Sequence, residues 1–370
     1  MKVMTLVGTR PEIIKLSRVI AALDQHMQHI LVHTGQSYDY ELNEVFFKDL
    51  EVRKPDHFLS AAAETPIETI AKVLVESDKL MEQHKPDAVL LYGDTNSCLA
   101  VIAAKRRKIP IFHMEAGNRS FDQRVPEEIN RKIVDHLSDI NLPLSEHARK
   151  YLEREGLPPE QIIKTGSCMK EVLAYYGPKI DKSQILTELK LQAGGYLLVS
   201  LHREENVDYE ENLRSIVKSL DLLAETFQKK VLVSTHPRTR KRMDTLSLKA
   251  QSPLVEFLKP FGFLDYVKLQ KNAYCVISDS GTITEEACLL GVPAITIRNA
   301  HERPEGMDVG TLIMSGTDPK DVLAAVKLAV GTRRAPMVPD YDVENVSEHM
   351  VKLIQSYTHY VDRYVWRKRI

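Results

Sequence analysis

The stretch KVMTLVGTRPEIIKLSRVIAALDQ (residues 2–25) predicts the unit from which the fold is built. KVMTLVG is a short apolar run typical of a buried strand, and PEIIKLSRVIAALDQ carries apolar residues at helical spacing. Between them, Gly8 permits a tight turn and Pro11 suits the first position of a helix. The stretch therefore predicts a strand followed directly by a helix, as in parallel α/β sheets.

The same alternation continues along the chain. Because the runs are apolar throughout and separated by helical patterns, they predict parallel sheets covered on both faces. The expected helices include residues 68–83, 210–227, 262–270 and 347–366. The further expected strands are HILVHTG (29–35), DAVLLYGD (87–94), IPIFHME (109–115), INLPL (140–144), YLLVSLH (196–202), KVLVSTH (230–236), LVEFLKP (254–260), YCVISDS (274–280) and AITIRN (294–299).

The length of 370 residues and a restart of this series near Gly195 predict two domains. The polar stretch YYGPKIDKS (175–183), with its Gly-Pro pair, marks the boundary. We expect two doubly wound, Rossmann-like α/β domains facing a cleft, over residues 1–170 and 171–350. The final helix, 351–370, is expected to pack back across the domains.

The composition is that of an ordinary globular protein, with 43% hydrophobic and 27% charged residues and a formal net charge of -1. This charge balance argues against a nucleic-acid or membrane-surface partner. No segment approaches the roughly 20 apolar residues of a membrane span, and the N-terminal apolar run is too short for a signal peptide. The four scattered cysteines predict reduced thiols in a cytoplasmic protein and no metal site.

Polar residues follow the strands of the first domain, where ligands bind in parallel sheets. Arg10 and Lys15, around the start of a helix, make a candidate phosphate site, although a solvated helix start fits equally well. Asp94, Glu115 and Glu127 each could cap a helix. Three carboxylates beyond neighbouring strand ends nevertheless predict a site that divides acid and base duties. His113 accompanies Glu115 in HME.

The second domain supplies two histidines at strand ends. His202 resembles a cleft residue, whereas His236 alone reads as a hydrogen-bonded core residue. A strand-to-helix turn at Ser280-Gly281 offers helix N–H groups to a phosphate, and Glu285 and Glu286 follow one turn later. A carboxylate at that distance from the turn can bind the hydroxyls of a ribose. A phosphate site and a ribose site side by side together indicate a nucleotide. The segment Glu302-Arg303-Pro304-Glu305 follows the next strand.

These residues together resemble the non-hydrolysing UDP-N-acetylglucosamine 2-epimerases, which have the two-domain glycosyltransferase-B architecture. The resemblance covers nearly the whole chain. Its motifs occur in family order: GTRPE with Lys15, TGQ, GDT, H-x-EAG, PEE-x-NR, HR-x-EN, DSG-x-x-x-EE and ERPE. It implies C2 epimerisation of a UDP-linked N-acetylated sugar through elimination and re-addition of UDP, without a cofactor.

The resemblance also implies roles for individual residues. Asp94, Glu115, Glu127 and His202 match the family's catalytic acid/base set, whose proton assignments stay open. The expected substrate contacts are Arg10 and Lys15 near the diphosphate, Ser280 and Gly281 at its helix, Glu286 at the ribose, and Arg303, His113 and His236.

Three departures from the family pattern distinguish this chain. TGQHR reads TGQSY, with Ser37 and Tyr38; HRREN carries Glu204 in place of an arginine; and Phe261 stands where a glutamine is usual. They argue against activation by a second UDP-N-acetylglucosamine. They also resemble the branch that converts UDP-N-acetyl-L-talosamine to UDP-N-acetyl-L-fucosamine for surface polysaccharide.

Four alternatives remain open from the sequence. The substrate pair of UDP-N-acetylglucosamine and UDP-N-acetylmannosamine belongs to the same family. A glycosyltransferase would share the architecture but requires an acceptor, and a hydrolysing epimerase would release free sugar. A nucleotide-sugar sensor would not need a base. A homodimer is the assembly that the family implies.

Overall fold

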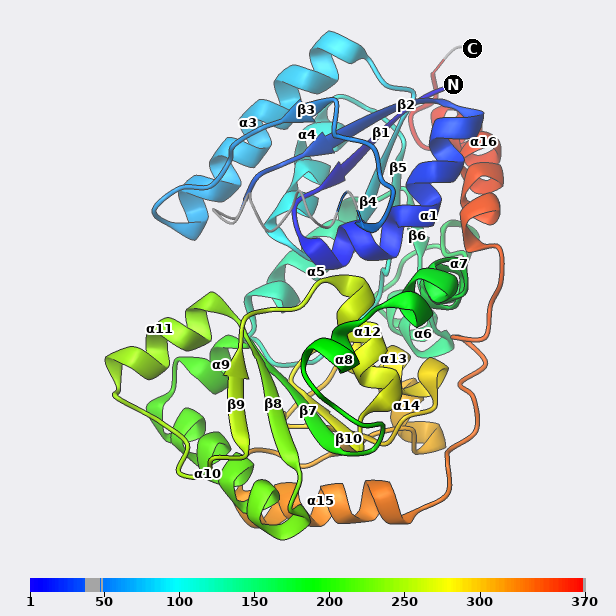
Figure 1. The fold of residues 1–370 in the computed structure, drawn as a ribbon. Coiled ribbons are helices and arrows are strands. Elements are labelled where there is room, and N and C mark those ends of the chain that lie inside the picture. Colours follow the sequence, from blue (N-terminus) through cyan, green and yellow to red (C-terminus); the bar gives the residue numbers. More distant parts are fainter. Residues whose placement is uncertain (37–46, 48, 369–370) are drawn as a thin grey trace. The chain divides into compact units, whose positions relative to one another are not determined.

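The computed structural model describes residues 1–36, 47 and 49–368 (Figure 1). The chain divides into two units, which we call the first unit (Met1–Tyr175 with Pro339–Ile370) and the second unit (Tyr176–Val338). Each carries one six-stranded sheet, and all the strand pairs among the described residues run parallel. The predicted α/β class is therefore confirmed.

The sheet of the first unit has the order β3-β2-β1-β4-β5-β6. Its β1 pairs with β2 on one side and β4 on the other, so the chain reverses direction across the sheet between β1 and β4. The strands are β1 (Lys2–Val7), β2 (Gln28–His33), β3 (His57–Phe58), β4 (Ala88–Tyr92), β5 (Ile111–Met114) and β6 (Ile140–Leu142).

Helices pack on this sheet through buried apolar residues. Met4 and Leu6 of β1 share a core cluster with Val73 and Met81 of α3. The last helix, α16, packs on α1. The helices of the first unit are α1 (Arg10–His26), α3 (Pro66–His84), η1 (Asn96–Ala100), α4 (Val101–Arg106), α5 (Pro126–Leu137), α6 (Glu146–Arg154), η2 (Pro159–Gln161) and α16 (Val346–Tyr364).

The sheet of the second unit has the order β12-β11-β10-β7-β8-β9. Read from its β9 edge and counted from β7, this is the same order as in the first unit. The reversal here lies between β7 and β10. The strands are β7 (Tyr196–Leu201), β8 (Lys230–Thr235), β9 (Val255–Leu258), β10 (Cys275–Ser278), β11 (Ala294–Thr296) and β12 (Ile313–Met314).

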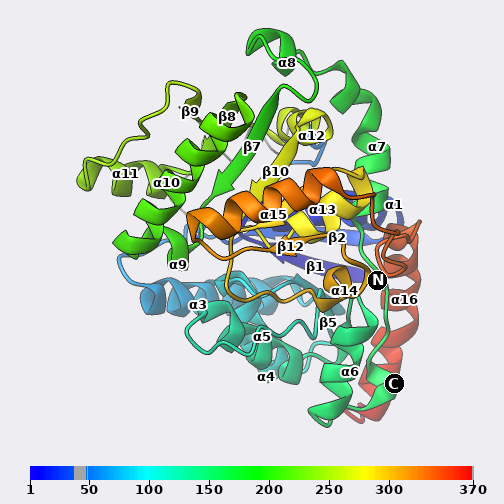
Figure 2. The same cartoon turned by 90° about the horizontal axis from the view of Figure 1, so that it is seen from below.

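One face of this second sheet is covered by α10 and α15, which contact each other (Figure 2). Leu197, Val199 and Leu201 of β7 face the cluster that these helices complete. The helices are α8 (Ile185–Glu188), α9 (Glu204–Val207), α10 (Glu210–Phe227), α11 (Pro237–Thr245), α12 (Phe263–Asn272), α13 (Ile283–Leu290), α14 (Pro304–Val309) and α15 (Pro319–Gly331).

The boundary between the units differs in detail from the sequence prediction. It falls inside the continuous helix α7 (Met169–Lys182), which contains Gly177 and Pro178. Residues 339–350, expected in the second domain, lie in the first unit. Contacts of Asp340 with Lys164 and with the Glu146 backbone hold that segment there, which a reading of local pattern could not reveal.

All the strands expected from apolar runs are present. The short edge strands β3 and β12 were not predicted, because two residues carry no readable pattern. Among the described residues, no helix has the length and apolar character needed to cross a membrane. The four cysteines are buried, and none of them forms a disulfide bond.

Candidate functional site

The predicted site residues gather at the carboxyl ends of the strands, near the reversal point of each sheet. In open α/β sheets this is where ligands bind. In the first unit, Arg10 begins the helix that follows β1, and the loops after β4 and β5 carry Asp94 and Glu115. In the second unit the loops after β7 and β10 carry His202 and Ser280.

Glu115 follows β5 in a left-handed backbone conformation, with φ of 62°. Its Oε2 atom lies 2.6 Å from Lys15 Nζ and accepts a hydrogen bond of 2.8 Å from the Tyr92 hydroxyl. The Lys15 side chain is only 3% exposed and that of Glu115 13%. Lys15, expected near a diphosphate, is therefore paired with one of the candidate acid/base carboxylates.

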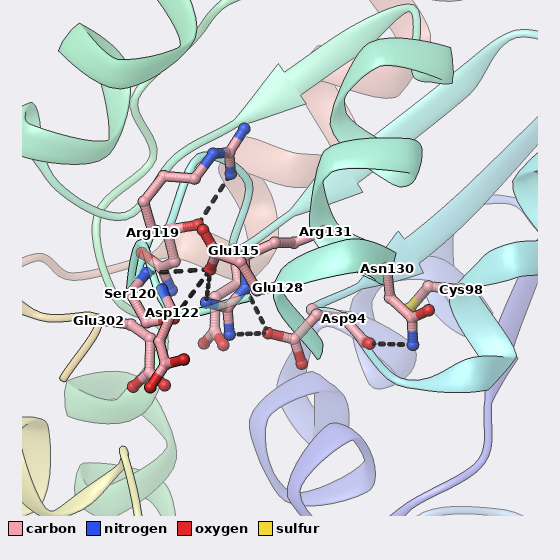
Figure 3. Close-up of polar contacts among 12 residues, drawn as sticks. Asp94, Cys98, Glu115, Arg119, Ser120, Asp122, Glu128, Asn130, Arg131 and Glu302 are labelled. Carbon is pink, nitrogen blue, oxygen red and sulfur yellow. Dashed lines mark hydrogen bonds and ion pairs between the residues drawn. The ribbon is translucent and has the colours of Figure 1, made fainter. Parts of the chain in front are cut away.

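Asp94 follows β4 and is bound by Arg131 of α5. The Arg131 Nε and Nη2 atoms lie 3.0 and 2.6 Å from Asp94 Oδ2, and Nη1 lies 2.7 Å from Glu128 Oε2. Asn130 donates to the Asp94 carbonyl at 3.0 Å. Figure 3 shows Arg131 bridging the two carboxylates. The Asp94 carboxylate is thus held in place on a cation.

The two neighbouring glutamates of α5 occupy different environments. Glu128 is fully buried and accepts hydrogen bonds from the Ser120 backbone, the Ser120 hydroxyl and the Phe121 backbone. Glu127 is half-buried, and its side chain makes no hydrogen bond or ion pair with any residue that the structure describes. Glu128, which the sequence did not single out, holds the preceding loop, whereas the carboxylate of Glu127 is the one available to a ligand.

His113 is buried, with 1% of its side chain exposed. Its Nε2 atom lies 2.7 Å from the Gly93 carbonyl oxygen, and Nδ1 lies 2.9 Å from Asp135 Oδ1 in an ion-pair contact that falls short of hydrogen-bond alignment. Burial alone would lower the pKa of His113, but Asp135 and the Gly93 carbonyl outweigh it and raise that pKa. His113 therefore ties the loop after β4 to α5, which fits a supporting role.

The start of α1 is less open to an anion than the sequence suggested. The Glu12 carboxylate accepts the backbone N–H groups of Gly8 (2.5 Å) and Thr9 (3.0 Å) and the Thr95 hydroxyl (2.5 Å). Burial raises the pKa of Glu12 to about 7, against the opposing effect of these hydrogen bonds. Because these N–H groups already have an acceptor, a phosphate at this turn would depend on Arg10, the first residue of α1.

In the second unit, His202 is oriented by a carboxylate that the sequence analysis missed. Its Nδ1 atom lies 2.9 Å from Asp279 Oδ1, and Asp279 also accepts the backbone N–H groups of His202 and Arg203. Burial alone would raise the pKa of Asp279, but His202 and the two N–H groups lower it to about 2. The His202 side chain is 42% exposed. The position of Asp279 in the DSG motif was the available signal.

A small pocket opens beyond β10 and β11. Arg303 is buried and pairs with Glu285 at 2.9 Å, while Arg298 makes a bidentate ion pair with Glu302 at 2.8 and 2.9 Å. The start of α13 thus lies beside cationic groups, as a phosphate site requires. The residues lining the pocket are Ser280, Gly281, Thr284, Thr296, Arg298, His301, Glu302, Arg303 and Leu312.

The remaining predicted residues lie in the same unit. Glu286 Oε2 accepts a hydrogen bond from Gln270 at 2.5 Å. His236 precedes α11, where its Nδ1 atom accepts the Arg238 N–H at 3.3 Å. Arg238 also pairs with Glu204 at 2.6 Å.

Phe261 packs against an apolar cluster that includes Tyr196 and Leu198. Ser37 and Tyr38 lie outside the described residues. Among the residues that are described, no three His, Cys, Asp or Glu side chains are arranged to hold a metal ion.

The chain is similar to a known family of enzymes. The model of the UDP-N-acetylglucosamine 2-epimerase family matches residues 21–355. The chain belongs to this family. A solved UDP-N-acetylglucosamine 2-epimerase from Rickettsia bellii is 55% identical, with 100% of each chain covered and a TM-score of 0.94. The family membership confirms the predicted enzyme class, an isomerase, and the glycosyltransferase-B-like fold.

Two further relatives differ in what they bind or act on. The Methanocaldococcus jannaschii UDP-GlcNAc 2-epimerase, solved with UDP-GlcNAc and UDP, is 34% identical over 96% of this chain and 99% of its own, with a TM-score of 0.91. The UDP-2,3-diacetamido-2,3-dideoxy-D-glucuronate 2-epimerase of Pseudomonas aeruginosa is 34% identical over 90% of this chain and 93% of its own. The family therefore spans more than one amino sugar.

Proposed function

We propose that this protein epimerises C2 of a UDP-linked N-acetylated amino sugar without net hydrolysis. The observation that carries the proposal is the pair of carboxylates after the adjacent strands β4 and β5. Asp94 and Glu115 are each held on a cation, Arg131 and Lys15 respectively. Removal of a weakly acidic C–H proton requires a base that is fixed in position, and these ion pairs fix both carboxylates.

The reaction proceeds in two halves. A carboxylate of the first unit takes the C2 proton, and the C1–O bond breaks with its electron pair passing to UDP, which leaves a 2-acetamidoglycal. UDP then adds back at C1 while a proton is delivered to the opposite face of C2. The second unit binds the nucleotide, with Ser280, Gly281 and Arg303 at the diphosphate and Glu286 at the ribose. Cations and helix N–H groups stabilise the departing negative charge.

We further propose that the sugar is UDP-2-acetamido-2,6-dideoxy-L-talose and the product UDP-N-acetyl-L-fucosamine, used for surface polysaccharide. Two departures from the family pattern support this choice. Glu204 replaces a cation with an anion, here paired with Arg238, and Phe261 replaces a polar amide with an apolar ring. The family pattern assigns these positions to the sugar end of the pocket, and there the changes would make the surroundings less polar or less cationic, as a sugar with a methyl group at C6 favours.

The second candidate is the interconversion of UDP-N-acetylglucosamine and UDP-N-acetylmannosamine. It is favoured by the match to the family model and by the relative from Rickettsia bellii. A homodimer in the cytoplasm is proposed for either reaction on the family resemblance. Light scattering of the purified chain would test the assembly.

Proton NMR in D2O tests the proposal directly. The protein is incubated separately with UDP-N-acetyl-L-talosamine and with UDP-N-acetylglucosamine, and the C2 proton is followed. Exchange and epimerisation of the 6-deoxy sugar alone would support the proposed substrate, and turnover of UDP-N-acetylglucosamine alone would establish the second candidate. Absence of C2 exchange with both would refute the epimerase function and favour a glycosyltransferase.

A further inference from the structure

Tyr92 is the last residue of β4 and is 3% exposed. Its hydroxyl donates a 2.8 Å hydrogen bond to Glu115 Oε2. A tyrosine hydroxyl buried at the carboxyl end of a strand needs an acceptor, and here that acceptor is a side-chain carboxylate. The contact joins β4 directly to the candidate base.

Lys15 binds the same oxygen atom from a different element. Its Nζ lies 2.6 Å from Glu115 Oε2 and 5.4 Å from the centroid of the Tyr92 ring. Tyr92 therefore donates to the carboxylate through its hydroxyl and faces the ammonium group with its ring. Two donors on one oxygen, one of them charged, favour the ionised carboxylate and restrict its rotation.

The backbone brings these groups together. Tyr92 pairs with Met114 in the β4–β5 register, and Gly93 N–H donates to the Met114 carbonyl at 2.9 Å. The next residue, Glu115, has a φ of 62°, a conformation that is about 1–2 kcal/mol unfavourable for residues other than glycine. Such a conformation persists where surrounding contacts over-determine it, as they do here through Lys15 and Tyr92.

We propose that Tyr92 is a positioning residue for Glu115, which its hydroxyl, together with Lys15, holds ionised and oriented to take the C2 proton. This inference rests on the proposed epimerase function. A buried tyrosine with a purely structural role is available for contrast in the same chain. The Tyr196 hydroxyl donates to the backbone carbonyl of Leu269 at 2.6 Å, and no catalytic candidate takes part.

The experiment compares Tyr92→Phe with the matched control Tyr196→Phe, since each removes one buried hydroxyl. For Tyr92→Phe we expect kcat to fall about tenfold or more with KM within about twofold, because a hydrogen bond to a charged group is lost. The acid limb of the pH–rate profile should move to higher pH by about half a unit or more. Tyr196→Phe should lower thermal stability and leave the pH profile unchanged. Equal pH profiles for Tyr92→Phe and the wild type would overturn the proposal.

A readout without turnover separates this proposal from the proposed function. In protein carrying ¹³C-carboxyl glutamate, the Glu115 signal is assigned by its absence from Glu115→Gln. We expect this signal to titrate at higher pH in Tyr92→Phe, and higher again in Lys15→Gln. An unchanged titration refutes the role of Tyr92 even in an active epimerase. A wild type that shows no C2 exchange refutes the epimerase function instead.

Discussion

The two sheets have the same strand order, but the carboxylate side chains that follow their strands differ in their partners and in their burial. In the first unit, carboxylates face cations, as Glu115 faces Lys15 and Asp94 faces Arg131. In the second unit, Asp279 at the reversal point is fully buried and accepts hydrogen bonds from the backbone N–H groups of His202 and Arg203. Its carboxylate also contacts the His202 ring and orients it. Shared topology thus places polar residues at the same edge of each sheet. On the proposed function, the burial of each carboxylate distinguishes those that react from those that support.

The largest expected effect comes from removing a base of the first unit. Glu115→Gln should lower kcat by roughly 10²–10⁴-fold, the range attributed to general base catalysis. The amide oxygen can still accept from Tyr92 and Lys15, so the fold should be retained. Steady-state kinetics and the far-UV circular dichroism spectrum check both parts. Near-normal turnover would show that Glu115 is not the base.

Glu127 and Glu128, which are adjacent in α5, test the distinction between a carboxylate that reacts and one that supports the structure. Glu127→Gln should reduce turnover by orders of magnitude at an unchanged melting temperature. Glu128→Gln should destabilise the protein by about 2–4 kcal/mol, because it breaks a buried ion pair with Arg131 and leaves loop N–H groups poorly matched. Steady-state kinetics measure the turnover of both variants, and urea unfolding measures their free energies of unfolding. A stability loss confined to Glu127→Gln would reverse the two assignments.

In the second unit, the lowered pKa of Asp279 predicts that the free energy of unfolding decreases in acid. Its pKa of about 2 lies below the ordinary value of 3.8, so its contribution to stability is complete above pH 3.8 and lost as the pH falls towards 2. The stability contributed by the ionised Asp279 carboxylate above pH 3.8, and lost in acid, amounts to about 2 kcal/mol. Urea unfolding of the wild type and Asp279→Asn at pH 6 and pH 3 measures it. The stability gap between the two proteins should narrow at pH 3, and a constant gap would contradict the interpretation.

The last comparison takes one glycine turn from each unit, and the smallest effect of all is expected at Gly281. A Cβ atom at Gly8 would lie 1.9 Å from Ser97 Oγ, so Gly8→Ala should be destabilising by about 1–3 kcal/mol. A Cβ atom at Gly281 would come no closer than 3.5 Å to Glu302 Oε2, so Gly281→Ala should change stability by less than about 0.5 kcal/mol. Thermal melts of both variants, with UDP titration of Gly281→Ala, test the difference. Equal melting temperatures would show that the turn at Gly8 relaxes.

Apolar periodicity was sufficient to predict the strands and the loops that carry the site. It failed where local pattern was weak, as at β3 and β12, and where distant contacts decided the outcome, as for residues 339–350. The supporting residues were missed for the same reason. Tyr92 reads as one more apolar strand residue, and nothing near Asp279 in the sequence shows that it contacts His202.

The sequence by itself determined the order of strands and helices and the polar residues at strand ends, because these follow from side-chain periodicity and turn chemistry. Only the tertiary structure decided which charges meet. Lys15 and Glu115 are 100 residues apart. They pair because β1, which leads into α1, and β5 both lie next to β4 in the parallel sheet, so the chain leaves all three strands at the same edge. Helix geometry, by contrast, separates Glu127 from Glu128. Successive side chains of α5 point in different directions around the helix, so these sequence neighbours differ in burial.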